Sequence, residues 1–431
     1  MEFGVGLMFL VFAVLVIAEA PIAFALSASA LIFLVVKGGI PLTVVVLRMA
    51  PGLDSFPLLA IPLFILAGNV LNAAGLATRI FDFTESLFGH IRGSLAHVNV
   101  AASMIFAGMS GVAQADAAGL GTIEIEAMKK RGFDPAFSAA VTAASSIIGP
   151  IIPPSVIMVI YAVLAQVSVG DLFLAGIVPG VLIGALLMAT IYFLAVTGRV
   201  TTEPNPRANI ADIGHAFVRA IPALLAPVLL VAGLLSGAAT PTELGAVTVI
   251  YATLIGFIYR ELTVQALIKC ISKSALTSGI LVFIISAAVP FGWVISVNNL
   301  PAELAEALLS FSDNKYVLLG IINLILLAAG LVMETTAILL IAVPALLPLA
   351  LALEINLVHF GVMMIFNLLI GATTPPFGVL LFIMMDIAKI SFAQMVSAML
   401  PFYLPLAVAL MVLTFVPELV LWLPNLVAQT P

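Results

Sequence analysis

The chain has 431 residues, of which 63% are hydrophobic and 8% are charged. A soluble domain carries roughly 25% charged residues, so this chain has too little polar surface to fold as a soluble protein. A formal net charge of -6, without a Lys/Arg-rich tract, argues against nucleic acid as a partner. The single cysteine excludes a disulfide framework and any CxxC metal or redox site. The composition therefore predicts an all-α polytopic protein of the lipid bilayer.

Ten apolar stretches are long enough to cross the hydrocarbon core, which takes about 20 helical residues. They lie near residues 3–18, 22–36, 56–76, 135–167, 172–197, 220–236, 244–259, 274–297, 360–388 and 392–422. A further helix over 40–50 is expected at the membrane interface. The first stretch is predicted to be a retained helix and not a signal peptide, because its n-region carries no positive charge.

Two other apolar stretches, 93–128 and 316–352, are too long for one helix and carry polar or small residues at their centres. We expect each to form a re-entrant helical hairpin. If both turn back, twelve of the 15 basic residues lie in the cytoplasm and Lys37, Arg48 and Lys315 lie outside, as the positive-inside rule requires. The two hairpins then enter from opposite faces, and both chain termini are predicted to be periplasmic.

The two hairpins belong to an internal repeat. Gly108 in the first hairpin is followed by Gly149 after 41 positions (149 − 108). Gly330 in the second hairpin is followed by Gly371 after the same 41 positions (371 − 330). Each second glycine precedes a Pro-Pro pair, which removes two backbone donors and disfavours helix before it. Each span with such a pair is predicted to be two half-helices joined by an unwound link. One break of this kind can serve helix packing alone, but two at matching spacing favour a functional link.

Inverted halves, each with a hairpin and a broken helix, are typical of secondary transporters. Unwound backbone at membrane depth persists only where it is buried in protein or lines a polar cavity. Its carbonyls, joined by hydroxyls, can replace the hydration shell of a small cation, while half-helix N-termini favour an anionic substrate. The hydroxyl side chains in these segments are Ser110, Ser155, Thr335, Thr336, Thr373 and Thr374. This chemistry suits Na⁺ better than a proton relay.

Two acids, Asp116 and Glu334, are carried deepest into the membrane by the hairpin assignment. A charge at that depth costs at least about 2.5 kcal/mol. A coupling role is one interpretation, and capping of a half-helix or pairing with a buried amide is the other. The two acids are not equivalent in the repeat, since they lie eight and four residues after the first glycine of their halves. Glu124 and Glu126 are expected to be interfacial charges.

Enzymatic motifs are scarce in the sequence. It contains no P-loop GxxxxGK[ST], and none of its four histidines begins an HExxH motif, which argues against an ATP-driven pump and a zinc protease. An intramembrane enzyme that uses Asp116 and Glu334 as paired acid and base is an alternative, but their unequal repeat positions speak against it. An ion gradient is the simplest source of energy. The chain is therefore predicted to be a transporter and not an enzyme.

Four motifs follow one another along the chain. They are the run Met109–Ala136, GPIIPPSV at Gly149–Val156, METTA at Met333–Ala337 and GATTPPFG at Gly371–Gly378. In this order they resemble the large membrane subunit of the TRAP (tripartite ATP-independent periplasmic) transporters, and the resemblance covers essentially the whole chain. It implies an inverted-repeat, elevator-type importer of organic anions such as dicarboxylates, sialic acid or sugar acids. It also implies coupling to Na⁺ entry and a location in a bacterial or archaeal cytoplasmic membrane.

The resemblance further implies partners and sites. The partners are a small membrane subunit of about four helices on a separate chain and a soluble periplasmic binding protein that delivers the substrate. At least two Na⁺ sites are implied, with ligands at Ser110, Gly111, Gly149, Pro150 and Ile152 in the first half and at Gly330, Met333, Thr336, Gly371 and Thr374 in the second. The substrate would lie between the hairpin tips, near Gln114, Pro154, Ser155, Thr335, Thr373 and Pro376.

The predicted domain organisation follows from these assignments. Scaffold helices are expected over 1–92, the first hairpin and broken helix over 93–167, scaffold and connecting helices over 168–314, the second hairpin and broken helix over 315–390, and a C-terminal helix over 391–431. The two segments with hairpins would form the moving transport domain. The alternative function is a stand-alone ion-coupled carboxylate carrier or exchanger that needs no binding protein.

Overall fold

The computed structural model describes residues 3–50, 53–200 and 205–428, and its regular structure in these ranges is entirely helical. The first half contains α1 (Phe3–Ile17), α2 (Ile22–Lys37), α3 (Thr43–Met49), the 3₁₀ helix η2 (Phe56–Leu59), α4 (Ala60–Ala73), α5 (Leu76–Phe88), α6 (Ser94–Ser110), α7 (Ala113–Ala118), α8 (Leu120–Lys130), α9 (Pro135–Ser146), α10 (Val156–Ala165) and α11 (Val169–Val196). The second half contains α12 (Ile210–Leu235), α13 (Pro241–Ile258), α14 (Val264–Val297), α15 (Leu300–Leu309), α16 (Lys315–Gly330), α17 (Thr335–Ala352), α18 (Leu357–Gly371), α19 (Val379–Ala388), α20 (Phe392–Phe415) and α21 (Pro417–Ala428).

Seven of the described helices are long and apolar enough to cross a membrane, and six of them coincide with predicted spans. The seventh, α17, is the second arm of the second predicted hairpin. The predicted interfacial helix over 40–50 is α3. Three predicted boundaries were wrong. Helices α12 and α14 each start ten residues before the predicted apolar span, at Ile210 and Val264, because Asn209 and Thr263 cap polar first turns that precede the apolar segment. The stretch over 392–422 is two helices, since Val416 leaves the helical conformation and Pro417 starts a new helix.

The predicted repeat is confirmed as a constant offset of 222 positions (330 − 108) between the two halves. The first hairpin is α6 followed by α7 and α8, and the second is α16 followed by α17. Shifted by this offset, the hairpin arms, the broken helix α9/α10 and the helix α11 fall on α16, α17, α18/α19 and α20 to within three residues. Both links carry a cis peptide bond, at Pro153–Pro154 and Pro375–Pro376.

Side-chain caps determine where the half-helices begin. Asp134 and Asn356, which are equivalent in the repeat, accept hydrogen bonds from the first backbone N–H groups of α9 and α18. Ser155 caps α10 in the same way at the end of the first link. Each of these bonds satisfies a backbone donor that has no partner inside the helix. The links can therefore end in well-defined helices although their own backbone is not helical.

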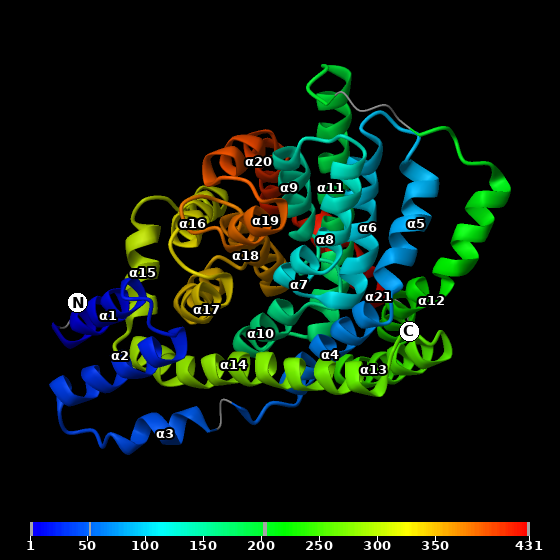
Figure 1. Ribbon diagram of the computed structural model, residues 1–431. Coiled ribbons are helices and arrows are strands. Elements are labelled where there is room, and N and C mark those ends of the chain that lie inside the picture. The colour runs from blue at the N-terminus through cyan, green and yellow to red at the C-terminus, as the bar shows by residue number, and fades with distance from the viewer. Residues whose placement is uncertain (1–2, 51–52, 201–204, 429–431) are drawn as a thin grey trace.

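The hairpins and broken helices of both halves pack into one body, and α14 runs along its edge (Figure 1). Helices α11 and α20 pack against each other, and each also packs against the broken helix of the other half. Helix α14 contacts α2, α4 and α17, and α4 packs against α13. These contacts place α14 beside the hairpin tips.

Buried polar side chains join each hairpin to its broken helix. Asn99 on α6 donates to Thr142 on α9 at 2.7 Å and accepts from Ser145 at 2.7 Å. In the second half, Asn367 on α18 donates to the side-chain oxygen of Asn323 on α16 at 2.7 Å. Ser145 and Asn367 are 222 positions apart (367 − 145), so they occupy equivalent places. Hydrogen bonds of this kind hold helices together where the surroundings are apolar.

Candidate functional site

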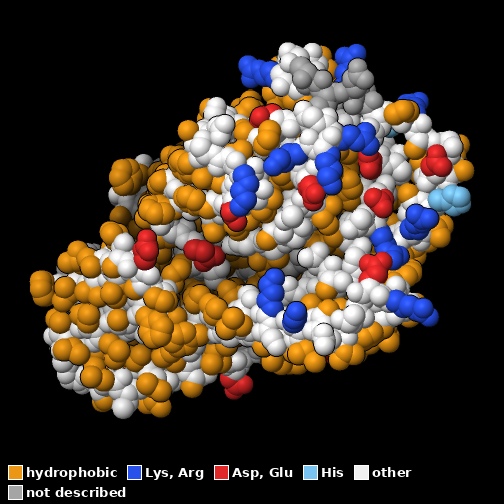
Figure 2. Space-filling view, viewed as in Figure 1, with side chains coloured by type: hydrophobic (Ala, Val, Ile, Leu, Met, Phe, Trp, Pro, Cys, Tyr) orange, Lys and Arg blue, Asp and Glu red, His pale blue; other side chains and the backbone are white. Residues whose placement is uncertain are grey.

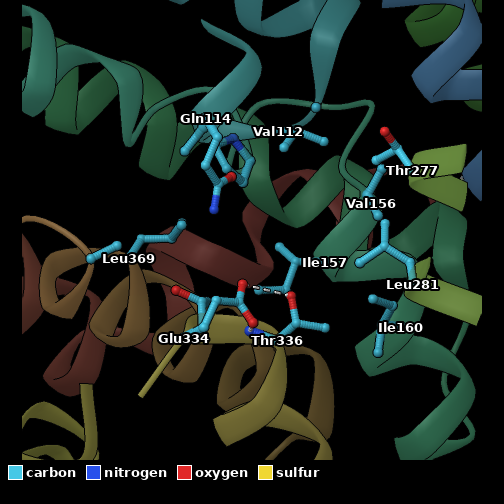
Figure 3. A pocket seen from close by; sticks show the side chains of 15 residues that line it. Val112, Gln114, Val156, Ile157, Ile160, Thr277, Leu281, Glu334, Thr336 and Leu369 are labelled. Atoms are coloured by element: carbon cyan, nitrogen blue, oxygen red, sulfur yellow. Dashed lines mark hydrogen bonds between the residues drawn. The ribbon is translucent and has the colours of Figure 1, made fainter. Parts of the chain in front are cut away.

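A cavity of about 250 Å³ lies between the tips of the two hairpins, and α14 forms its third side. Residues 111–114 of the first hairpin and 334–336 of the second line it. Figure 3 shows Gln114 pointing into the cavity from one side and Glu334 and Thr336 from the opposite side, with Thr277 of α14 nearby. Much of the remaining wall is apolar and consists of Val156, Ile157, Ile160, Leu281 and Leu369.

The tip of the first hairpin touches the first link. Gly111 has a φ of +64°, and a Cβ atom there would collide with the carbonyl oxygen of Pro154. The tip therefore needs glycine both for its backbone conformation and for space. The backbone N–H of Val156 donates to the Gly111 carbonyl at 3.3 Å, which ties the link to the tip. Within the link, the Ser155 hydroxyl donates to the Pro150 carbonyl at 2.6 Å.

Asp116 lies at the junction of this tip and this link. Its side chain is buried and accepts a hydrogen bond from the Ser110 hydroxyl. The second carboxylate oxygen, Oδ2, has no hydrogen-bond partner, and a Cβ atom on Gly149 would collide with it. A buried carboxylate oxygen without a partner is costly unless a cation or proton binds it. Ser110, Gly149 and the Asp116 carboxylate together can supply oxygen ligands to a small cation.

The tip of the second hairpin touches the second link through two glycines. A Cβ atom on Gly371 would lie 2.8 Å from the Cα atom of Gly330, and one on Gly330 would lie 3.0 Å from the Cα atom of Gly371. The hydroxyls of Thr373 and Thr374 both donate to the carbonyl of Ile370, at 2.8 and 2.7 Å. Direct backbone contact of this kind is open only to glycine.

Glu334 at the second tip both caps a helix and lines the cavity. Its carboxylate caps α17 by accepting from the backbone N–H groups of Thr336 and Ala337, at 2.8 and 3.2 Å. It also accepts from the Thr336 hydroxyl at 2.9 Å and lines the cavity. Capping was one of the two interpretations of this acid, and the hydrogen bonds confirm it. The carboxylate still faces the cavity, so the cap is compatible with a contact to an ion or a solute.

The family described as the tripartite ATP-independent periplasmic transporter, DctM component, matches residues 9–419 of the chain. The chain belongs to this family. The sialic acid TRAP transporter large permease protein SiaM of Vibrio cholerae is 41% identical to it over 415 residues, which are 96% of each chain. The C4-dicarboxylate TRAP transporter large permease protein DctM of Pseudomonas aeruginosa is 37% identical over 374 residues, 86% of this chain and 87% of that one.

Among solved structures, the YdaH transporter of Alcanivorax borkumensis has a similar fold, with a TM-score of 0.60 at 15% identity over 89% of each chain. The chain is therefore the large permease subunit of a TRAP transporter, a multi-pass integral membrane protein that is a transporter and not an enzyme. The predicted family and fold class are confirmed.

The predicted site residues of the permease fall in three places. Gln114, Pro150, Gly111, Thr335, Thr336 and Glu334 line the cavity. Six others lie where a hairpin tip meets its link or in the adjoining turns: Ser110, Gly149, Gly330, Gly371, Thr374 and Met333. Four predicted substrate contacts do not line the cavity: Pro154, Ser155, Thr373 and Pro376. The hydroxyls of Ser155 and Thr373 are buried and donate to backbone carbonyls instead. The Ile152 side chain packs against Gly180 of α11.

The prediction that Glu124 is an interfacial charge was wrong. This side chain is 1% exposed, and neither of its carboxylate oxygens has a hydrogen-bond partner. The second arm of the first hairpin bends at Gly119, and α8 then packs against both α6 and α9. Glu126, in contrast, is exposed and pairs with Lys130 at 3.0 Å. Nearness to a basic run in the sequence does not tell which face of α8 is buried.

Proposed function

We propose that this large permease imports a small organic anion across the cytoplasmic membrane of a bacterium or archaeon, driven by Na⁺ entry. One observation carries the proposal: two hairpin tips and two broken-helix links converge on a single cavity with polar groups from both halves. The names of two relatives support the solute class, because sialic acid and C4-dicarboxylates are both carboxylate anions. The solute would lie between Gln114 and the Thr335–Thr336 pair.

In this proposal Na⁺ is a co-transported substrate with a site in each half. The first site is at Ser110, Gly149 and the unpartnered oxygen of Asp116. The second is at the contact of Gly330 with Gly371, beside Thr336 and Thr374. Hydroxyl, carbonyl and carboxylate oxygens are the ligands that hard cations prefer. Bound Na⁺ would offset the negative charge of the acids at the two tips and so allow an anionic solute to bind beside them.

An elevator movement fits the way the cavity is enclosed. Two of its walls belong to the predicted moving segments, 93–167 and 315–390, and the third belongs to α14 in the predicted scaffold. On the scaffold side, Gly68 of α4 lies so close to the first tip that a Cβ atom there would be 3.0 Å from the Ser110 Cα atom. The tips would carry the solute past α4 and α14. A separate small membrane subunit of about four helices would brace the scaffold, a periplasmic binding protein would deliver the solute, and both chain termini would be periplasmic.

Uptake into proteoliposomes tests the proposal. The permease is reconstituted with a small membrane subunit and a periplasmic binding protein of the TRAP family from the same organism, and radiolabelled sialic acid and succinate serve as probes. We expect uptake of one probe when Na⁺ is higher outside, and none when K⁺ replaces Na⁺. Uptake that ignores the Na⁺ gradient would contradict the coupling. Equal uptake without the binding protein would instead favour a stand-alone carrier.

A further inference from the structure

A second chamber of about 320 Å³ adjoins the cavity between the hairpin tips. It lies between α4, the first hairpin and α14, and it shares Val112, Gln114 and Thr277 with the first cavity. The two spaces therefore lie side by side, and these three side chains stand at their common border. Figure 2 shows the surface hollowed between the upper and lower parts of the molecule, with acidic side chains (red) and basic side chains (blue) at its edges.

The two spaces differ in charge. Among the described residues, the cavity between the tips has one charged lining side chain, Glu334, and no basic one. The second chamber has one charged lining side chain, Lys273, and no acidic one. An anionic group in the first cavity would face a carboxylate at short range, which is unfavourable. The same group in the second chamber would face an ammonium.

Lys273 is available for a ligand. Its side chain is exposed, and within the described parts of the chain it forms no ion pair or hydrogen bond. The helix that carries it is held in place, since Asn69 of α4 donates to the hydroxyl of the next residue, Ser274, at 2.8 Å. Gln114 and Asn72 add amide groups that line the same chamber and have no hydrogen-bond partner among the described residues. A lysine with amide donors around it is suited to a carboxylate or a similar acid group.

We infer that the second chamber binds the acid group of the transported anion, with Lys273 as its cationic ligand, while the uncharged part of the solute occupies the cavity between the tips. This inference rests on the proposed function. It assigns the recognition of the anionic charge to the scaffold helix α14 and not to either hairpin. The count of basic residues predicts that Lys273 lies on the cytoplasmic side, so we infer that the chamber holds the solute at the inward-facing stage, before its release.

Thiol protection in the purified permease tests the inference without any uptake measurement. Thr277→Cys is introduced into a Cys270→Ser background, which removes the native cysteine, and its modification by N-ethylmaleimide is timed. We expect succinate or sialic acid to slow the modification. Lys273→Met should raise the protecting concentration about tenfold, the effect of losing one charge-assisted hydrogen bond. Lys273→Arg should retain protection.

Lys269→Met is the matched control, because Lys269 lies one turn earlier on α14, is exposed and does not line the chamber. It should leave the protecting concentration unchanged. If the Lys273→Met and Lys269→Met variants were protected at the same anion concentration, the inference would be overturned. Equal protection by succinamide, the uncharged analogue of succinate, would also overturn it.

Chemical rescue of uptake gives a second, independent measurement. In the Cys270→Ser background, Lys273→Cys should raise the KM for the transported anion about tenfold. A methanethiosulfonate reagent with an ammonium group should restore the KM, and one with a sulfonate group should not. Restoration by both reagents, or by neither, would contradict a role for the positive charge. Failure of the background variant to take up any anion would count against the proposed function instead, and the protection experiment would still decide the inference.

Discussion

The two hairpin–link pairs share a backbone plan but place their acids differently. In the first half, Asp116 lies behind the tip, is 1% exposed and holds the Ser110 hydroxyl. In the second half, Glu334 lies at the tip itself, caps α17 and faces the cavity. The glycines and the Pro-Pro pairs keep the 222-residue offset, whereas the two acids do not. The repeat thus duplicates backbone geometry, and each half provides its own side-chain chemistry within it.

The largest expected effect is on stability, and it differs between the two link glycines, Gly371 and Gly149. A Cβ atom on Gly371 would meet the Gly330 backbone, which cannot turn away. We expect Gly371→Ala to lower the free energy of unfolding by about 2 kcal/mol, a typical cost of overpacking, and to abolish uptake. Gly149→Ala should cost less stability, because the Asp116 carboxylate that it meets can rotate. Thermal unfolding in detergent measures both variants.

Gly279→Ala is the control for this pair, since nothing lies within 4 Å of a Cβ atom at that helical position. It should be neutral or slightly stabilising. If Gly371→Ala were as stable as Gly279→Ala, the direct contact between the second tip and its link would not exist in the protein.

The next largest effects are on Na⁺ dependence and on the KM for the anion, and they differ between the two acids. Asp116→Asn removes a charge behind the tip and should raise the Na⁺ concentration for half-maximal uptake about tenfold, which corresponds to about 1.4 kcal/mol. The KM for the anion at saturating Na⁺ should not change. Glu334→Gln keeps an oxygen for the cap of α17 but removes a negative charge from the cavity. It should weaken Na⁺ binding similarly and also lower the KM for the anion.

Both variants are measured by uptake at varied Na⁺ and varied anion concentrations. An identical change of the anion KM in the two variants would show that the two acids hold equivalent positions relative to the solute. If both variants behaved like the wild type, neither acid would take part in ion coupling.

Backbone features were predictable from the sequence because their causes are local. Glycine spacing and Pro-Pro pairs restrict the chain wherever they occur, so the hairpins and both broken helices were found at the right residues. Side-chain direction was less accessible. The hydroxyls of Ser155 and Thr373 fit a cation site by residue type, yet both turn to backbone carbonyls inside their links.

Tertiary packing decided the remaining differences. Glu124 stands close to a run of basic residues in the sequence, which is typical of an interfacial charge, but α8 packs between α6 and α9 and buries it. Lys273 was counted only as one of twelve cytoplasmic charges. Its place beside Gln114 depends on the approach of α14 to the first hairpin, and the hydropathy of α14 does not encode that approach.

The smallest expected effect concerns the hydrogen bonds that join hairpin to broken helix. Ser145→Ala should lower the free energy of unfolding by about 1 kcal/mol, because it leaves the Asn99 side-chain oxygen buried without this donor. Asn367→Ala, at the equivalent position of the second half, should cost a similar amount of stability because it removes the donor to Asn323.

Ser146→Ala is the control, since the Ser146 hydroxyl donates only to a backbone carbonyl of its own helix, at 2.7 Å. Thermal unfolding in detergent should rank Ser146→Ala as the mildest of the three. A much larger loss from Asn367→Ala alone would mean that the second hairpin depends on its polar contact more than the first, and that the two halves differ in packing as well as in chemistry.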